Sequence, residues 1–183
     1  AVGSSLPLRA KKGSVYDGGI REPTVMWWPG TIPAGRVCSE VAGTIDMLPT
    51  LLEWFGAQSA RDRLAGNSLL DLLQQDGRGG REEIVVRDDA GGWGIRSREL
   101  FLVRPGEGLD ATQSGGPGRL YSKPDDAWDL VDVSEQGIDD VERLARRLDE
   151  LIDEILLSSR KKARHGQDLR RLPGALSPLL TWS

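Results

Sequence analysis

Two neighbouring lysines stand out among the residues that could do chemistry. Lys11 and Lys12 lie in the stretch LRAKKGSVYDGGIREP, residues 8–23, together with glycines, arginines and acids. A lysine ammonium is a compact cation that suits a tetrahedral oxyanion, and glycines let a backbone turn tightly beside a ligand. A KKG sequence in a loop is also typical of a solvated surface. The stretch therefore fits two interpretations, an anion site or an exposed loop.

Few other residues could form a catalytic or metal site. His165 and Cys38 are the only histidine and cysteine in the sequence. The histidine follows a basic run at an expected helix end, which favours a solvated cation, and a single thiol forms no internal disulfide. Paired acids occur at Asp88–Asp89 and Asp125–Asp126, in contexts where acids are common for turn reasons. Because zinc-type spacings and phosphate-loop motifs are absent from the sequence, we predict no metal site within it.

Composition predicts a globular chain without a general affinity for nucleic acid. The 183 residues are 38% hydrophobic, which is enough for a core, and 28 acids against 24 bases give a net charge of -4. The six tryptophans are scattered, which favours core positions over a base-stacking platform. No apolar run approaches the roughly 20 residues of a membrane-spanning helix. The sequence opens without a methionine or an apolar signal segment, so we expect the natural start to lie upstream. Because a signal peptide would lie there too, we make no prediction of the cellular location.

The elements expected in the first part of the chain are one strand and two helices. The β-branched and aromatic run Thr24–Trp28 predicts a short buried strand. A helix is expected to begin near Asp46, whose side chain can cap it, and to end at Gly56 in a left-handed conformation. Its apolar stripe consists of Met47, Leu48, Leu51, Leu52 and Phe55. A shorter helix is expected over Ser68–Gln75, and the glycine- and charge-rich segment after it predicts a domain boundary at residue 82.

The elements expected next are short strands. They are Ile84–Arg87, Gly94–Arg96, Leu100–Val103 and Trp128–Val133. The sequence IRSREL indicates a tight hairpin turn at Ser97 and Arg98. The glycine-rich segment 105–118 predicts a long surface loop.

A long amphipathic helix is the strongest local prediction. Apolar residues recur at helical spacing from Ile138 to Lys162, with acids in the first turn and bases in the last turn before Gly166. We therefore predict an α/β fold, α+β within this chain. Residues 1–82 would belong to an α/β domain, residues 83–165 would form a small subdomain of antiparallel strands and this helix, and residues 166–183 would be a tail.

The order of these motifs resembles one known family. LRAKKGSVYDGGIREP, followed by WPGTIPAG and TIDMLPTLLEWFGA, resembles the C-terminal third of the formylglycine-dependent sulfatases, of the arylsulfatase type within the alkaline phosphatase superfamily. GIRSRELFLV and AWDLVDVSEQ resemble the hairpin and the approach to the closing helix in the same family. The resemblance covers roughly residues 8–156. The positions that fit the first motif are Leu8, Arg9, Lys12, Gly13, Tyr16, Asp17, Gly18, Gly19, Ile20, Arg21 and Pro23.

The resemblance implies a catalytic, substrate-binding role for Lys12. In these enzymes the lysine of the lysine-glycine pair binds a sulfate oxygen, where a fixed cation stabilises the negative charge that develops during ester cleavage. Lys11 is an alternative, because Ala10 and Lys11 stand where the family commonly has glycines. The residues expected to support the loop are Gly13, Gly18 and Gly19, together with an ion pair between Asp17 and Arg21.

The resemblance also indicates what the sequence lacks. The family nucleophile is a formylglycine made within a Cys-X-Pro-Ser-Arg context, whereas Cys38 lies in CSEVA. The family's calcium ligands are aspartates from its N-terminal half and an Asp-Asn pair a short distance upstream of the first matching segment, and no counterpart is present. We therefore expect the C-terminal portion of a sulfuric ester hydrolase that is inactive alone. Its parent would bind calcium and a sulfate ester, and its partner would be the missing N-terminal half.

Two other functions remain open from the sequence. The chain could be a non-catalytic binding module with the sulfatase C-terminal fold, in which case Trp27 and Trp28 are candidates for an exposed apolar patch. It could also belong to a relative in the same superfamily that hydrolyses phosphate or phosphonate esters.

Overall fold

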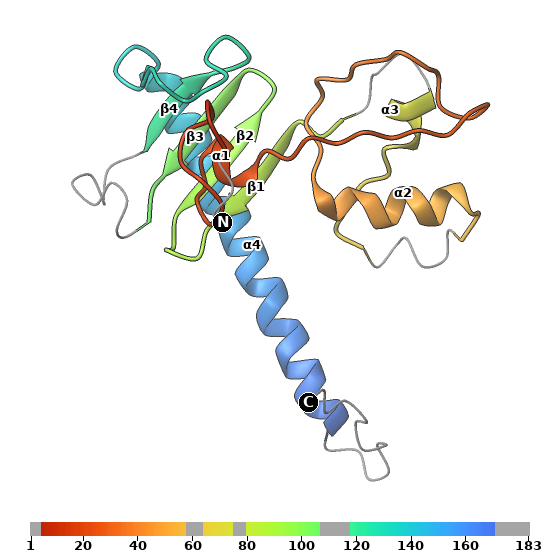
Figure 1. Cartoon of the computed structure of the whole chain (residues 1–183). Helices are drawn as coiled ribbons and strands as arrows, with labels where there is room; N and C mark the ends of the chain where they lie inside the picture. The colour runs from red at the N-terminus through yellow and green to blue at the C-terminus, as the bar shows by residue number, and fades with distance from the viewer. Residues whose placement is uncertain (1–4, 58–63, 75–79, 107–117, 171–183) are drawn as a thin grey trace, which may run out of the picture. The chain divides into compact units, whose positions relative to one another are not determined.

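The computed structural model describes residues 5–57, 64–74, 80–106 and 118–170, with side chains up to residue 158. The chain divides into two compact units, residues 1–145 and 146–183. The first unit holds every strand of the described residues, three α-helices, and the start of a fourth helix that continues into the second unit (Figure 1).

A four-stranded antiparallel sheet is the centre of the first unit. Its strands are β1 (Glu83–Arg87), β2 (Trp93–Ser97), β3 (Leu100–Arg104) and β4 (Arg119–Ser122). They pair in chain order, β1-β2-β3-β4. Side chains alternate between the two faces of the sheet. Ile95, Leu102 and Leu120 stand opposite one another on one face, and all three are buried.

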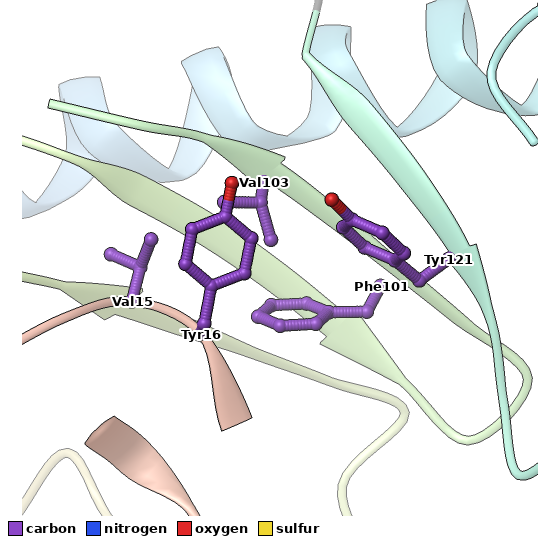
Figure 2. Close-up of a cluster of buried hydrophobic side chains, with 5 residues drawn as sticks. All are labelled: Val15, Tyr16, Phe101, Val103 and Tyr121. Carbon is purple, nitrogen blue, oxygen red and sulfur yellow. The ribbon is translucent and has the colours of Figure 1, made fainter. Parts of the chain in front are cut away.

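The other face of the sheet carries an aromatic core cluster. Phe101 and Val103 on β3 and Tyr121 on β4 pack with Val15 and Tyr16, which precede the first helix (Figure 2). The rings of Tyr16 and Tyr121 meet edge to face with centroids 6.2 Å apart. Burial of each such side chain stabilises the fold by roughly 1.5–3 kcal/mol. The segment around Lys12 is therefore joined to the sheet through its own hydrophobic residues.

Three of the four predicted strands are confirmed, and the fourth prediction is wrong. β1, β2 and β3 match the expected positions, and the β2–β3 hairpin turns after Ser97 as expected. Residues 128–133 form no strand, and β4 lies earlier in the chain. The Asp126 side chain explains why residues 128–133 form no strand. Its two carboxylate oxygens accept backbone N–H groups of this segment, at 3.0 Å from Leu130 and 2.8 Å from Val131.

The predicted strand Thr24–Trp28 is also absent. These residues have no regular secondary structure, and Val25 and Trp27 are 91% and 84% exposed. No strand among the described residues pairs with this segment. A β-branched and aromatic sequence favours a strand only where a partner and a covering layer are supplied.

Helix α2 (Met47–Trp54) follows the 3-10 helix η1 (Thr44–Asp46). Gly56 has a φ of 72°, which confirms the expected left-handed end. Asp46 does not cap α2 with its carboxylate, contrary to expectation, because that carboxylate binds Arg81 and the N–H groups of other segments. The predicted apolar stripe is largely exposed, at Leu48, Leu51 and Phe55. Trp54 instead stacks on Trp28, with ring centroids 4.5 Å apart.

Two of the remaining helices follow the sequence prediction, and one was not predicted. The short helix α1 (Asp17–Ile20) lies within the stretch 8–23, where no helix was expected. Helix α3 (Leu70–Gln74) lies within the predicted range. The Leu69 N–H donates to Thr50 Oγ1 at 2.9 Å, which ties α3 to α2. The long helix α4 (Ile138–Arg170) is confirmed, although it continues past Gly166, where we expected its end. Among the described residues no helix is long and apolar enough to span a membrane.

Candidate functional site

Lys11 and Lys12 lie in a short loop that closes on itself. The Gly18 N–H donates to the Arg9 carbonyl at 2.9 Å, so the two ends of the loop meet. Within it, the Ser14 N–H donates to the Lys11 carbonyl at 3.2 Å. Both lysine side chains are exposed, and neither has an ion-pair partner in the part of the chain that the structure describes. We call residues 9–18 the lysine loop.

The glycines of the lysine loop are required by the backbone. Gly13 has a φ of 90°, which side chains rarely tolerate. A Cβ on Gly18 would lie 2.6 Å from the Ala10 carbonyl oxygen, so α1 packs directly against the loop backbone. Ala10 itself has a φ of 62°. The loop is therefore a tight turn whose conformation leaves little room for change.

Asp17 anchors the end of the lysine loop through several bases. Its side chain is buried, and its carboxylate lies 3.8 Å from Arg21 NH1, the partner expected from the sequence. Arg96 NH1 on β2 is also 3.8 Å away, and Lys123 Nζ approaches to 3.3 Å. The expected ion pair is thus the exposed edge of a larger cluster, whose other bases, Arg96 and Lys123, are more buried than Arg21.

Lys123 and Asp129 form the centre of this cluster. Both side chains are at most 1% exposed, and Lys123 Nζ donates to Asp129 Oδ1 at 2.5 Å. The same ammonium donates to the Asp126 carbonyl at 2.6 Å. The other carboxylate oxygen of Asp129 accepts the Asp17 N–H at 3.1 Å. We call Asp17, Lys123 and Asp129 the anchor cluster.

Burial controls the protonation chemistry of the groups around the anchor cluster. Burial raises the pKa of Asp129 from its ordinary value, and the hydrogen bonds from Lys123 and the Asp17 N–H offset part of that rise. Burial also lowers the pKa of the Arg96 guanidinium, while the charges of Asp17 and Asp129 act in the opposite direction. Burial raises the pKa of the Tyr121 phenol, so the hydroxyl near Arg9 stays protonated across the neutral range.

Arg9 connects the start of the lysine loop to the same place. Its NH1 donates to the Asp129 carbonyl at 2.9 Å and to the Tyr121 hydroxyl at 3.0 Å. Its guanidinium also lies 4.3 Å from the centroid of the Tyr16 ring. This contact is a cation–π interaction, and it adds to the hydrogen bonds that fix the side chain.

Sequence reasoning placed Lys12, Gly13, Gly18, Gly19, Asp17 and Arg21 together, and the structure describes them in one short segment. It did not identify Lys123, Asp129 or Arg96 as neighbours of that segment. The only available signal was AWDLVDVSEQ, which contains Asp129.

One member of each predicted acid pair binds the backbone of a turn. Asp88 accepts the Gly92 N–H at 2.6 Å, and Asp126 accepts the Val131 N–H. The His165 side chain lies outside the described residues.

Comparisons with known proteins match part of the chain to one family. The family model described as Sulfatase matches residues 2–57. Human arylsulfatase A is 42% identical over 105 residues, which are 57% of this chain and 20% of that protein. The chain is a relative of the sulfatases. Dog N-acetylgalactosamine-6-sulfatase is 41% identical over 71 residues, 39% of this chain and 13% of that relative. The chain thus spans a small part of the sulfatases it matches.

Solved structures show that the fold is shared as well. A Bacteroides thetaiotaomicron protein, described under the metabolism of multiple glycosaminoglycans, aligns with a TM-score of 0.64 at 21% identity. The alignment covers 81% of this chain and 32% of the Bacteroides protein. The resemblance and the α/β fold class predicted from the sequence are confirmed.

Similarity to the sulfatases implies calcium and a formylglycine in the full-length members of that family. The described residues of this chain fit neither group. No group of three or more potential metal ligands occurs among the described residues. The buried carboxylates of Asp17 and Asp129 already contact the Lys123 ammonium. Cys38 is exposed and lies in CSEVA. Among the described residues, the buried acids at this place are therefore already paired with a base.

Proposed function

We propose that this chain supplies the lysine loop of a sulfuric ester hydrolase site, in which Lys12 binds a sulfuryl oxygen. The observation that carries the proposal is an exposed ammonium, without an acidic partner among the described residues, on a loop whose base is buried and closed. A cation held in this way is available to an anion and needs little reorganisation when the anion binds.

The charges beneath the loop support an anionic ligand. Four bases and three acids gather there: Arg9, Arg21, Arg96 and Lys123, with Asp17, Asp126 and Asp129. Lys11 and Lys12 add further positive charge at the loop. The local excess of positive charge favours a sulfate group over a cation, in contrast with the net charge of -4 of the whole sequence.

The chemistry assigned to Lys12 is electrostatic. As a sulfate ester is cleaved, negative charge develops on the sulfuryl oxygens and on the leaving oxygen, and an ammonium beside them lowers the barrier. This chain offers no formylglycine sequence and no metal-ligand group among its described residues. We therefore propose that the chain is inactive alone and that residues outside this sequence complete the site.

The test compares Lys12→Ala with Lys11→Ala in the complete reading frame, using para-nitrophenyl sulfate. Loss of Lys12 should lower kcat/KM about 10²–10³-fold, while the fold, followed by circular dichroism, stays intact. Arg98→Ala serves as a control, because it removes an exposed cation that pairs with Glu40 at 3.0 Å. A loss confined to Lys11→Ala would assign the role to that residue. Equal activity of both variants and the wild type would reject the lysine loop as a sulfate site.

A second candidate function is a non-catalytic binding module, favoured by the exposed apolar residues near α2. Trp27 is 84% exposed and Phe55 is 72% exposed. In the complete protein, absence of any hydrolysis of para-nitrophenyl sulfate or para-nitrophenyl phosphate would favour this module. Faster hydrolysis of the phosphate ester would instead favour the phosphate-ester relative.

A further inference from the structure

We propose that Asp129, with Lys123, is a positioning residue that holds Lys12 at the anion site. The inference rests on the proposed function of Lys12 and extends it to residues more than a hundred positions away in the chain. Asp129 and Lys123 are buried and do not touch the anion. They act on it by fixing the loop that carries the ammonium.

Both ends of the lysine loop converge on Asp129. At the start of the loop, Arg9 NH1 donates to the Asp129 carbonyl at 2.9 Å. At the end of the loop, the Asp17 N–H donates to the Asp129 carboxylate at 3.1 Å. One residue therefore holds the two ends together, in addition to the hydrogen bond between Gly18 and Arg9.

The backbone conformation of Asp129 suits this double contact. Its φ is 57°, in the left-handed region that aspartate and asparagine tolerate better than most residues. In this conformation its carbonyl and carboxylate bind the two ends of the same loop. Lys123 neutralises the buried carboxylate and also reaches Asp17, so it joins both acids of the cluster.

A role in stability alone does not explain the arrangement fully. A buried ion pair gives little net stability compared with apolar residues of similar size, because desolvation offsets the attraction. What the pair does provide is a fixed geometry, and electrostatic catalysis depends on fixed geometry. The cluster contacts the base of a loop that presents two exposed lysines.

Asp129→Asn is the sharpest variant because it changes few atoms. Each carboxylate oxygen accepts from a donor: Oδ1 from Lys123 and Oδ2 from the Asp17 N–H. A carboxamide has one oxygen and one NH2 group, so one of the two donors must face another donor. Asparagine also tolerates the positive φ. Glu40→Gln is the matched control, since it makes the same acid-to-amide change in the ion pair with Arg98.

The experiment is a double-mutant cycle on kcat/KM in the complete protein, with para-nitrophenyl sulfate as the probe. Asp129→Asn alone should lower kcat/KM roughly 10- to 100-fold through misplacement of Lys12. If Asp129 acts through Lys12, Lys12→Ala should cost much less in the Asp129→Asn background than in the wild type. In the Glu40→Gln background the cost of Lys12→Ala should be unchanged.

The outcomes separate the two proposals. If Lys12→Ala costs nothing in the wild type, the proposed function fails. If Lys12→Ala is costly in the wild type and equally costly in the Asp129→Asn background, the proposed function stands and the positioning role is overturned. A smaller cost in that background supports both.

Hydrogen exchange of this 183-residue chain gives a readout that does not depend on activity. In Asp129→Asn the Asp17 and Gly18 amides should exchange about tenfold faster, while β3 amides stay protected. Unchanged exchange at both amides would overturn the positioning role. This readout therefore tests the anchoring of the loop even if Lys12 has no role in sulfate binding.

Discussion

The described residues of the first unit contain two buried acid–base clusters, which differ in their balance of charge. In one, the Asp46 carboxylate faces a single guanidinium: Arg81 Nε lies 2.9 Å from Oδ1 and 2.8 Å from Oδ2. The Gly43 and Asn67 N–H groups donate to the same carboxylate, at 2.9 and 2.7 Å. In the other, the anchor cluster, two carboxylates share Lys123 below a loop with two exposed lysines.

The two clusters differ in the charge that they leave for other groups. The Asp46 cluster is neutral as a pair, and both of its carboxylate oxygens are occupied by donors. It joins the start of α2 to the chain at Arg81, which also forms an isolated β-bridge with Val41. The anchor cluster contacts more bases than acids and lies beside exposed ammonium groups. The positive charge beside the anchor cluster would favour an anion at the exposed loop above it, whereas the neutral Asp46 pair leaves no such excess of charge.

The largest effect on stability is expected for Lys123→Met. The change leaves Asp17 and Asp129 buried beside each other without their shared cation, and breaking such a buried pair costs about 3–5 kcal/mol. Urea unfolding of the chain, followed by circular dichroism, measures the loss. Because the two acids then repel each other, adding Asp17→Asn should recover part of the stability. A loss below about 1 kcal/mol would mean that the cluster is hydrated and not buried as described.

A smaller loss, about 2–3 kcal/mol, is expected for Arg81→Met, because the backbone donors to Asp46 remain. Burial would raise the pKa of Asp46, but the hydrogen bonds from Arg81 and from the Asn67 and Gly43 N–H groups hold it below its ordinary value of 3.8. The stability that Asp46 contributes is therefore present above pH 3.8 and is lost as the pH falls through the lower pKa of the folded state. Acid titration of the unfolding free energy measures this loss.

The pH dependence of Arg81→Met sharpens the comparison. Without Arg81, the pKa of Asp46 should rise, and the acid-induced loss should become smaller than in the wild type. An unchanged pH profile would indicate that the backbone N–H groups alone lower the pKa, and that the ion pair contributes little.

The smallest effect is expected for Arg98→Ala, which provides an exposed pair for comparison with the two buried clusters. Arg98 is 60% exposed at its side chain and pairs with Glu40 at 3.0 Å. An exposed ion pair contributes about 0–1 kcal/mol, and salt screens it. A loss above that range in the same urea experiment would show that this pair is linked to the core, and the contrast with the buried clusters would weaken.

Local patterns predicted the elements whose interactions are local. The sequences of β1 to β3 contain alternating or continuous apolar residues, and a short hairpin joins β2 to β3. In α4, apolar residues recur at helical spacing over many turns. The segments 24–28 and 128–133 have strand-like composition but no strand partner. In the second of these, the Asp126 carboxylate takes the N–H groups that a strand would use. Composition does not reveal such competition.

The candidate site likewise has a part that the sequence predicted and a part that only the structure revealed. Lys12 and the glycines beside it form a continuous motif, so the sequence predicted their role as a group. Lys123 meets Asp17 across 106 positions, and Asp129 meets it across 112. Only the folded sheet brings those residues together. The sequence therefore indicated the loop that presents the cation, and the structure was needed to identify what holds it.

The stacked pair of Trp28 and Trp54 gives the molecule an optical reporter of its own. The rings are 4.5 Å apart and inclined by only 19°, and Trp28 is 40% exposed. Indole emission shifts to shorter wavelength when water leaves the ring. Anything that covers this surface should therefore change the intrinsic fluorescence and its quenching by acrylamide, without an attached dye. Trp54→Phe would keep a stacking partner for Trp28 and show how much of the signal of the six tryptophans comes from Trp54.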